Sequence, residues 1–234
     1  IAHFQKRVEP LKAEKAARQA PIHFTFYDSD RLCLGDKLRK NFGYAALSQI
    51  YHELGLHTFL TNRQRRSKEQ YDANTIMKLL VYSRLLFPAS KKSSYENRER
   101  FFEKTDYSLD DVYRCLSFLD KHRENLQIWL NDRIRETYGR DTSLIYYDVT
   151  NYYFETDEQN DFLRKGLSKE HRPNPIIQMG LFMDNQGLPI TYELFPGNTN
   201  DCLTYRPNFG RIKKQFGLGR VISVADKGMT TGDN

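Results

Sequence analysis

Two aspartates in the second half of the chain stand at expected strands, where together they could bind a metal ion. Asp148 lies within SLIYYDVTNYYFE (143–155), a run rich in β-branched and aromatic residues that predicts a buried strand. Asp226 follows the apolar run Val-Ile-Ser-Val-Ala and ends a second short strand. Burying an unpaired carboxylate is costly, so such a group is usually paired, protonated or bound to a metal.

The spacing of the two aspartates favours a shared metal site. Seventy-eight residues separate Asp148 from Asp226, enough for a hairpin and a helix between the two strands. If the first and fourth strands are neighbours in one sheet, both carboxylates project from it at a similar height. Mg²⁺ prefers oxygen ligands, and two such ions roughly 3.5–4 Å apart activate a water or a 3′-hydroxyl for attack on a phosphodiester. The sequence therefore predicts a site for Mg²⁺, or for Mn²⁺ in its place.

Each aspartate also has a purely structural interpretation. A single Asp in a strand is often an edge residue or a hydrogen-bonded group, and an Asp before Lys-Gly at a strand end is often part of a turn. Taken singly, each aspartate fits the structural interpretation better; their joint arrangement shifts the balance toward the metal site but does not decide between the two.

The elements that must position the aspartates follow from a change of period at residue 143. Leu144, Tyr146, Asp148 and Thr150 share one face of the first strand, because side chains alternate along a strand. IIQMGLFMDNQGLPITYELF (176–195) predicts two strands joined at a turn over residues 184–187. A helix capped by residue 200 or 201 and followed by Gly217 comes next, and then the strand before Asp226. The expected order is strand, strand, strand, helix, strand.

The first half of the chain has a helical period instead. Apolar residues recur at steps of three and four from residue 36 to residue 140. Five helices are expected there: one carrying Tyr44, Leu47, Tyr51 and Leu54 and stopping at Gly55; one from about Lys68 to Pro88; one opened by a Ser93–Glu96 capping box and carrying Phe101 and Phe102; one opened by Ser108 with Asp110 and Asp111; and one carrying Leu126, Trp129, Leu130 and Ile134 and ending at Gly139.

Charge is distributed unevenly over the 234 residues. Residues 1–140 hold 26 Lys and Arg against 18 Asp and Glu, a net charge of +8, whereas residues 141–234 hold 10 against 12, a net charge of −2. A basic half beside a mildly acidic half suits a nucleic-acid-binding region attached to a site that collects carboxylates, although solvated basic helices give the same pattern. Basic residues expected to cluster between the helices are Arg63, Arg65, Arg66, Lys91 and Lys92.

Composition limits the remaining possibilities. The apolar fraction of 39% and the 15 Tyr and 15 Phe indicate a globular protein, and no apolar run reaches the length of a membrane span. Three distant cysteines, Cys33, Cys115 and Cys202, suggest reduced thiols and a cytoplasmic location. The chain begins with Ile1 and stops at Asn234 shortly after a strand, so we expect a fragment of a longer protein.

Three stretches of the second half resemble the catalytic domain of DDE transposases from bacterial insertion sequences, in the IS-four-like group. They are YYDVTNYYFE, RKGLSKEHRPNPIIQMGLFMDNQGLPITYELFPGNTND and VADKGMTTGDN. The resemblance implies an α/β architecture: an incomplete RNase H-like catalytic fold, β-β-β-α-β, preceded by an α-helical domain. The implied divisions are a basic segment at 1–35, a helical DNA-binding domain at 36–140, and the first part of the catalytic domain at 141–234.

Carried over by position, the resemblance assigns roles to individual residues. Asp148 and Asp226 would be the first two members of a catalytic, metal-binding triad, and Gly228 and Asn234 would belong to the turn after the second. The third member in the family is a glutamate on a later helix, and the sequence to Asn234 does not include it. Lys169, His171 and Arg172 precede the hairpin in a basic loop that could contact DNA phosphate or remain a solvated surface loop.

The function implied is Mg²⁺-dependent DNA cleavage and strand transfer, lost in this chain if the third carboxylate is missing. Its partners would be transposon ends and target DNA, bound by a homodimer in a synaptic complex. One alternative is a DNA-binding remnant without catalysis, and another is a different RNase H-like nuclease. A phosphoaspartyl hydrolase is disfavoured, because that chemistry needs a second Asp two residues after Asp148, where this chain has Thr150.

Overall fold

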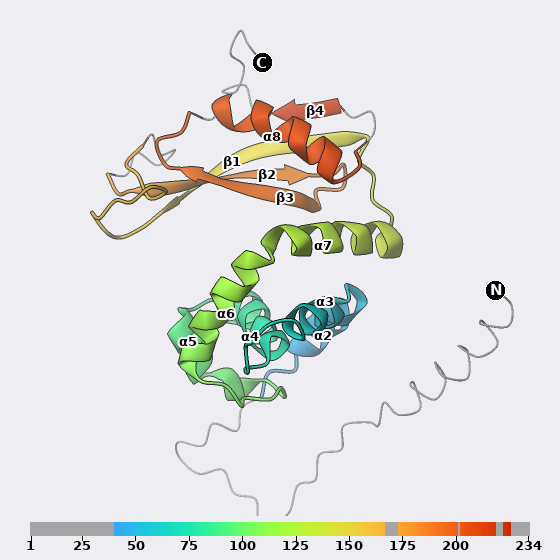
Figure 1. The fold of residues 1–234 in the computed structure, drawn as a ribbon, viewed down its shortest axis with the longest axis vertical. Coiled ribbons are helices and arrows are strands. Elements are labelled where there is room, and N and C mark those ends of the chain that lie inside the picture. The colour runs from blue at the N-terminus through green and yellow to red at the C-terminus, as the bar shows by residue number, and fades with distance from the viewer. Residues whose placement is uncertain (1–39, 167–172, 201, 219–221, 226–234) are drawn as a thin grey trace, which may run out of the picture. The chain divides into compact units, whose positions relative to one another are not determined.

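A computed structural model describes residues 40–166, 173–200, 202–218 and 222–225, and helices precede a sheet in it (Figure 1). The helical elements are α2 (Tyr44–Glu53), α3 (Leu56–Gln64), α4 (Ala73–Leu86), α5 (Lys91–Glu96), the 3₁₀ turn η1 (Arg98–Arg100), α6 (Leu109–Lys121) and α7 (Arg123–Tyr138). They are followed by β1 (Leu144–Tyr153), β2 (Ile176–Met183), β3 (Pro189–Pro196), α8 (Cys202–Gln215) and β4 (Ile222–Ala225). Within the described ranges, none of the helices has the length and apolar character needed to cross a bilayer.

Several helix boundaries follow the capping residues of the sequence. Ser108 and Asp111 open α6 as expected, and they form a capping box in which each side chain accepts the other residue's backbone N–H. Gly55 ends the first helical segment as expected and adopts a left-handed φ of 65°. Gly139 likewise follows α7. A side-chain cap therefore sets the start of α6, and the positive φ open to glycine allows the other two boundaries.

Three helical expectations were wrong. The segment after Gly55 forms α3, which was not expected, and the next helix begins at Ala73, not near Lys68. Asp72 sets that start, since its carboxylate accepts the backbone N–H groups of Asn74 and Thr75 at 2.9 and 3.2 Å.

The Ser93–Glu96 capping box was the third error. Ser90 is the capping residue of α5, and its hydroxyl accepts the N–H of Ser93 at 3.2 Å. Ser93 therefore lies inside the first turn. Phe101 and Phe102 follow η1 and lie outside any helix.

The helices enclose a hydrophobic core of their own, built around Leu60, Ile76, Tyr82 and Val112, each with no exposed surface. The last long helix joins this core through Trp129, whose indole N–H donates to the carbonyl of Leu54 at 2.9 Å. This hydrogen bond from the partly buried indole fixes α7 against the turn between α2 and α3.

Along the chain, three strands, a helix and a fourth strand follow one another, which confirms the expected order. Within the sheet, the strands lie side by side in the order β3-β2-β1-β4. β1, β2 and β3 pair antiparallel, and β4 pairs parallel to β1. The first and fourth strands are therefore neighbours, which is the condition for a metal site shared by the two aspartates. Their described pairing ends where Tyr147 lies opposite Ala225.

One face of the sheet is covered by α8 (Figure 1), and burial along β1 alternates accordingly. Ile145, Tyr147 and Val149 are buried and share a core with Ile212 and Phe216 of α8. The expected set on the other face, Leu144, Tyr146, Asp148 and Thr150, does share that face, and Asp148 is exposed there. The expectation of a buried Asp148 was therefore wrong, because the described residues cover β1 on one side only.

The turn between β2 and β3 is held by a buried carboxylate, Asp184. Its Oδ1 accepts the N–H groups of Gln186 and Leu188, both at 2.9 Å, and Gly187 takes the positive φ of 77° that the turn needs. Its Oδ2 lies 3.7 Å from Nε of Arg140, and both side chains are fully buried. At that distance the attraction is Coulombic and not a direct hydrogen bond.

Replacing Asp184 with Ala should destabilise the fold strongly. The change leaves the Arg140 charge buried without its partner and removes two hydrogen bonds of the turn, which together should lower the free energy of unfolding by about 3–5 kcal/mol. Urea denaturation measures this. Asp157→Ala is the matched control, since the Asp157 side chain is 92% exposed, and it should change stability by less than about 0.5 kcal/mol.

Equal costs for the two variants would show that the Arg140–Asp184 pair does not hold the turn. Adding Arg140→Met to the Asp184→Ala variant should recover part of the loss, because the unpaired buried charge is then removed as well.

Candidate functional site

Asp148 occupies the middle of β1, opposite Leu181 of β2 in the sheet register. Its face also holds Tyr146, and, from the neighbouring strand, Ile222 and Val224, which are 69% and 44% exposed. The carboxylate therefore projects from the side of the sheet away from α8. An exposed carboxylate on a regular strand has the oxygen donors and the access that a hard divalent cation requires.

The preceding residue, Tyr147, fixes the direction in which Asp148 points. Its buried hydroxyl donates to Oγ1 of Thr204 in α8 at 2.8 Å, and its ring lies 4.4 Å from that of Phe182. Because neighbouring side chains on a strand point to opposite faces, anchoring Tyr147 under α8 holds Asp148 on the open face.

Gly180 of β2 makes room for the Tyr147 ring. A Cβ placed on Gly180 would lie 2.2 Å from the tyrosine hydroxyl and 2.9 Å from two ring carbons. Neither Gly180 nor Thr204 was singled out from the sequence. The alternating pattern of β1 signalled that Tyr147 is inward, but no local signal identified its partners on β2 and α8.

The second expected carboxylate, Asp226, lies outside the described residues, and so do Gly228 and Asn234. β4 is described to Ala225, the residue before Asp226 in the sequence. Within the described part of the chain, no group of three or more His, Cys, Asp or Glu side chains could hold a metal ion. The metal pair thus stays a prediction.

The basic loop residues Lys169, His171 and Arg172 also lie outside the described residues. The described parts of the chain on either side of them are fastened together. Arg164 and Ile176 exchange two backbone hydrogen bonds of 3.2 and 2.8 Å, and Gly166 packs so closely on Gly197 that a Cβ would lie 1.9 Å from its carbonyl oxygen. The described residues that flank the loop are therefore hydrogen-bonded to each other and packed on the residue that follows β3.

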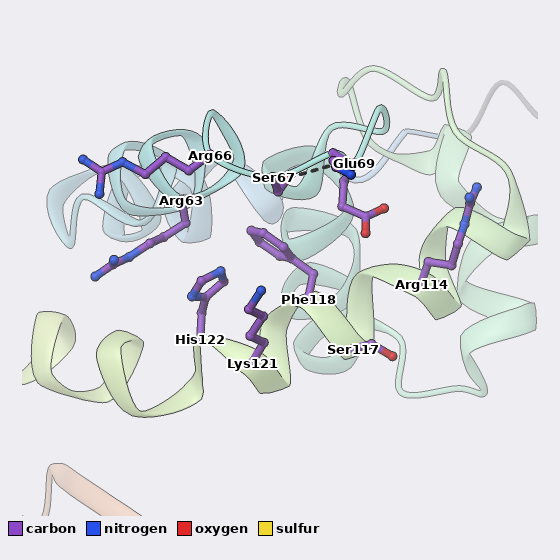
Figure 2. A pocket seen from close by; sticks show the side chains of 10 residues that line it. Arg63, Arg66, Ser67, Glu69, Arg114, Ser117, Phe118, Lys121 and His122 are labelled. Carbon is purple, nitrogen blue, oxygen red and sulfur yellow. Dashed lines mark hydrogen bonds between the residues drawn. The ribbon is translucent and has the colours of Figure 1, made fainter.

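A second candidate site is a pocket in the helical part, which we call the basic pocket. It has a volume of about 430 Å³ and lies where the end of α3 and the following loop meet the end of α6 (Figure 2). The residues that line it are Arg63, Arg66, Ser67, Lys68, Glu69, Arg114, Ser117, Phe118, Lys121 and His122. Of the basic residues expected to cluster, Arg63 and Arg66 line this pocket, whereas Lys91 and Lys92 begin α5.

His122 lies among the charged side chains of the basic pocket, and they affect its pKa. Its ring packs edge-on against Phe118, with centroids 4.8 Å apart. Partial burial, followed by the charges of Arg63 and Lys121, lowers the pKa of His122 below its ordinary value of 6.5. Both the burial and the two nearby positive charges therefore favour the neutral imidazole.

No family model and no curated protein sequence matches the chain. Among solved structures, a Mos1 transposase paired-end complex with the left transposon end is similar over 71% of this chain and 55% of that one, at 15% identity and a TM-score of 0.28. A pre-cleavage Mos1 transpososome is similar over 72% and 56%, at 16% identity and a TM-score of 0.27. A Mos1 mariner paired-end complex with Mn matches over 77% and 63%, at 14% identity and a TM-score of 0.24. The chain spans little more than half the length of the first two.

Replacing Gly180 with Ala should displace Tyr147 and lower stability. Overpacking of this kind typically costs about 1–3 kcal/mol, measurable by urea denaturation. Gly210→Ala in α8 is the control, because a Cβ there meets nothing within 4 Å and Ala favours a helix. A Gly180→Ala variant as stable as the control would mean that the Tyr147 ring is not confined.

The pKa of His122 should respond to the charge of Lys121. Lys121→Gln removes one of the two positive charges that disfavour the imidazolium, so the pKa of His122 should rise toward 6.5. An NMR titration of the imidazole carbon-bound protons checks this. Lys92→Gln, on α5, serves as the control and should leave the pKa unchanged. A pKa that stays constant or falls in Lys121→Gln would contradict the charge distribution of the pocket.

Proposed function

We propose that the chain carries the first part of an RNase H-like catalytic domain of a DDE transposase, preceded by a DNA-binding helical region. The observation that carries the proposal is the parallel pairing of β1 with β4, whose described register ends at Tyr147 and Ala225. These residues immediately precede Asp148 and Asp226 in the sequence. The strand order and the three stretches that resemble the insertion-sequence family add support.

The proposed role of Asp148 and Asp226 is to hold Mg²⁺, or Mn²⁺, between them. Asp148 suits this role because its carboxylate is exposed on a rigid central strand. When bound, a pair of such ions would activate water, and then the freed 3′-hydroxyl, for in-line attack on a DNA phosphodiester. Tyr147 and Thr204 would keep the Asp148 carboxylate in place by fastening β1 to α8. In the family, a glutamate on a later helix completes the set.

The proposed partners are transposon ends and target DNA, bound by a homodimer. Lys169, His171 and Arg172 would contact phosphate from the loop whose base is closed beside β2 and β3. The basic pocket favours a second candidate function, DNA binding without catalysis, because that pocket belongs to the helical region and needs none of the carboxylates.

Asp148→Asn should weaken Mn²⁺ binding while leaving DNA affinity unchanged. Paramagnetic Mn²⁺ broadens amide NMR signals near its site, so low concentrations should broaden those of residues 147–149 in the wild-type chain. The substituted side chain is a neutral amide and binds a hard cation more weakly than a carboxylate does, so the broadening should be lost in the variant. Fluorescence anisotropy with duplex DNA measures the second property.

Asp157→Asn is the matched control, because it removes one exposed carboxylate outside β1. Its broadening pattern should equal that of the wild type. If Asp148→Asn broadened like the wild type, Asp148 would not be a metal ligand and the catalytic proposal would fail. DNA binding without any broadening at residues 147–149 would favour the non-catalytic alternative.

A further inference from the structure

The basic pocket brings positive charges together from segments far apart in the sequence. Arg63 belongs to the last turn of α3, whereas Lys121 ends α6 and His122 follows it. Figure 2 shows the side chains of Lys121 and His122 rising from the end of α6 toward α3, from which Arg63 descends. Arg63 and Lys121 both lie close enough to His122 to lower its pKa, after the larger effect of burial.

Most of this charge is not neutralised by neighbouring acids. Five of the ten lining residues are Lys or Arg, and Glu69 is the one carboxylate among them. Arg114 pairs with Asp111. Within the described residues, Arg63, Arg66, Lys68 and Lys121 form no ion pair. A concave surface with surplus positive charge and an apolar floor concentrates its field, which attracts anions.

The walls of the pocket are held in position before any ligand arrives. Phe118 is buried and forms the floor, and the Arg63 guanidinium stacks at 5.3 Å over the ring of Phe59. Gln64 fixes the loop after α3, because its side chain accepts the N–H of Ala73 at 3.0 Å and donates to the carbonyl of Tyr71. Arg63 and the loop after α3 therefore lose little freedom when an anion binds.

The spread of the charges favours a chain of phosphates over a single one. Arg63, Lys121 and His122 lie at one end of the pocket, and Arg114 stands at the other, beyond Phe118 and Glu69 (Figure 2). A single compact anion would contact the basic side chains at one end only. Successive phosphates of one strand can follow the basic side chains and pass the carboxylate.

We propose that the basic pocket binds consecutive backbone phosphates of duplex DNA and is a principal DNA contact of the helical region. The proposal rests on the proposed DNA-binding function and names the surface responsible for it. Contacts of this type carry no base information and are sensitive to salt, because each one releases counterions from the DNA.

The test compares DNA binding by the wild-type chain and a pocket double variant, Arg63→Gln with Lys121→Gln. Fluorescence anisotropy with a labelled duplex at several salt concentrations gives the affinity and its salt dependence. Each phosphate contact contributes roughly 0.9 to the slope of log K against log salt concentration, so the slope should become shallower by about 2. Lys91→Gln with Lys92→Gln is the control: it removes the same charge from α5 and should retain the wild-type slope.

The outcomes separate the pocket from the broader function. A double variant with the wild-type affinity and slope overturns the pocket and leaves DNA binding by another surface intact. A wild-type chain that binds no DNA overturns both. Circular dichroism of each variant checks that it is folded, and if the double variant is not, Lys121→Gln alone, at an exposed position, should still reduce the slope by about 1.

Two further arms test the choice of ligand. Adding duplex DNA should shift the His122 NMR signals and raise its pKa, since a bound phosphate favours the imidazolium. Inorganic phosphate or ATP at the same phosphate concentration should not reproduce this effect. If either did so, the pocket would be a site for a small phosphate ligand and the DNA proposal would be wrong. Tighter binding of an RNA duplex of the same sequence would also overturn it.

Discussion

The direction in which Asp148 points depends on how Tyr147 is held. One strand position separates a side chain buried under α8 from a carboxylate on the open face, and a slip by one residue would exchange them. The Tyr147 hydroxyl donates to Thr204, and its ring occupies the space that a side chain at Gly180 would take. The core on one side of the sheet therefore determines the chemistry available on the other.

This arrangement resolves the apparent conflict of an aspartate within a strongly apolar strand. Burial would require an ion partner or a metal to offset the loss of hydration, but the described part of the chain leaves Asp148 exposed. The buried carboxylate of this region is Asp184, and it has the compensation that burial demands: two backbone donors and the Arg140 charge. The two aspartates differ because one completes a turn and the other faces outward.

Periodicity predicted most of the sheet because the relevant signals are local. The alternation in residues 143–155 gave the face of Asp148, and the turn at 184–187 gave the hairpin. The burial of that face could not be predicted, because it depends on which side α8 covers. The short helix α3 was missed for a related reason: its apolar residues Leu56, Phe59 and Leu60 find their core only through tertiary packing.

The basic pocket shows the same limit at the level of a site. The sequence placed Arg63 and Arg66 in a basic cluster. Lys121 and His122 follow more than fifty residues later and reach the same pocket through tertiary packing of α6 against α4 and α5. Phe118 packs against the His122 ring and Phe59 lies under the Arg63 guanidinium, so aromatic side chains support both polar groups. A metal site has few ligands, so each carboxylate must be held in place by its β-strand. A phosphate-binding surface needs only enough positive charge along the path of the DNA backbone. The proposed carboxylate site would lie on the sheet, and the proposed phosphate surface would lie on the helices.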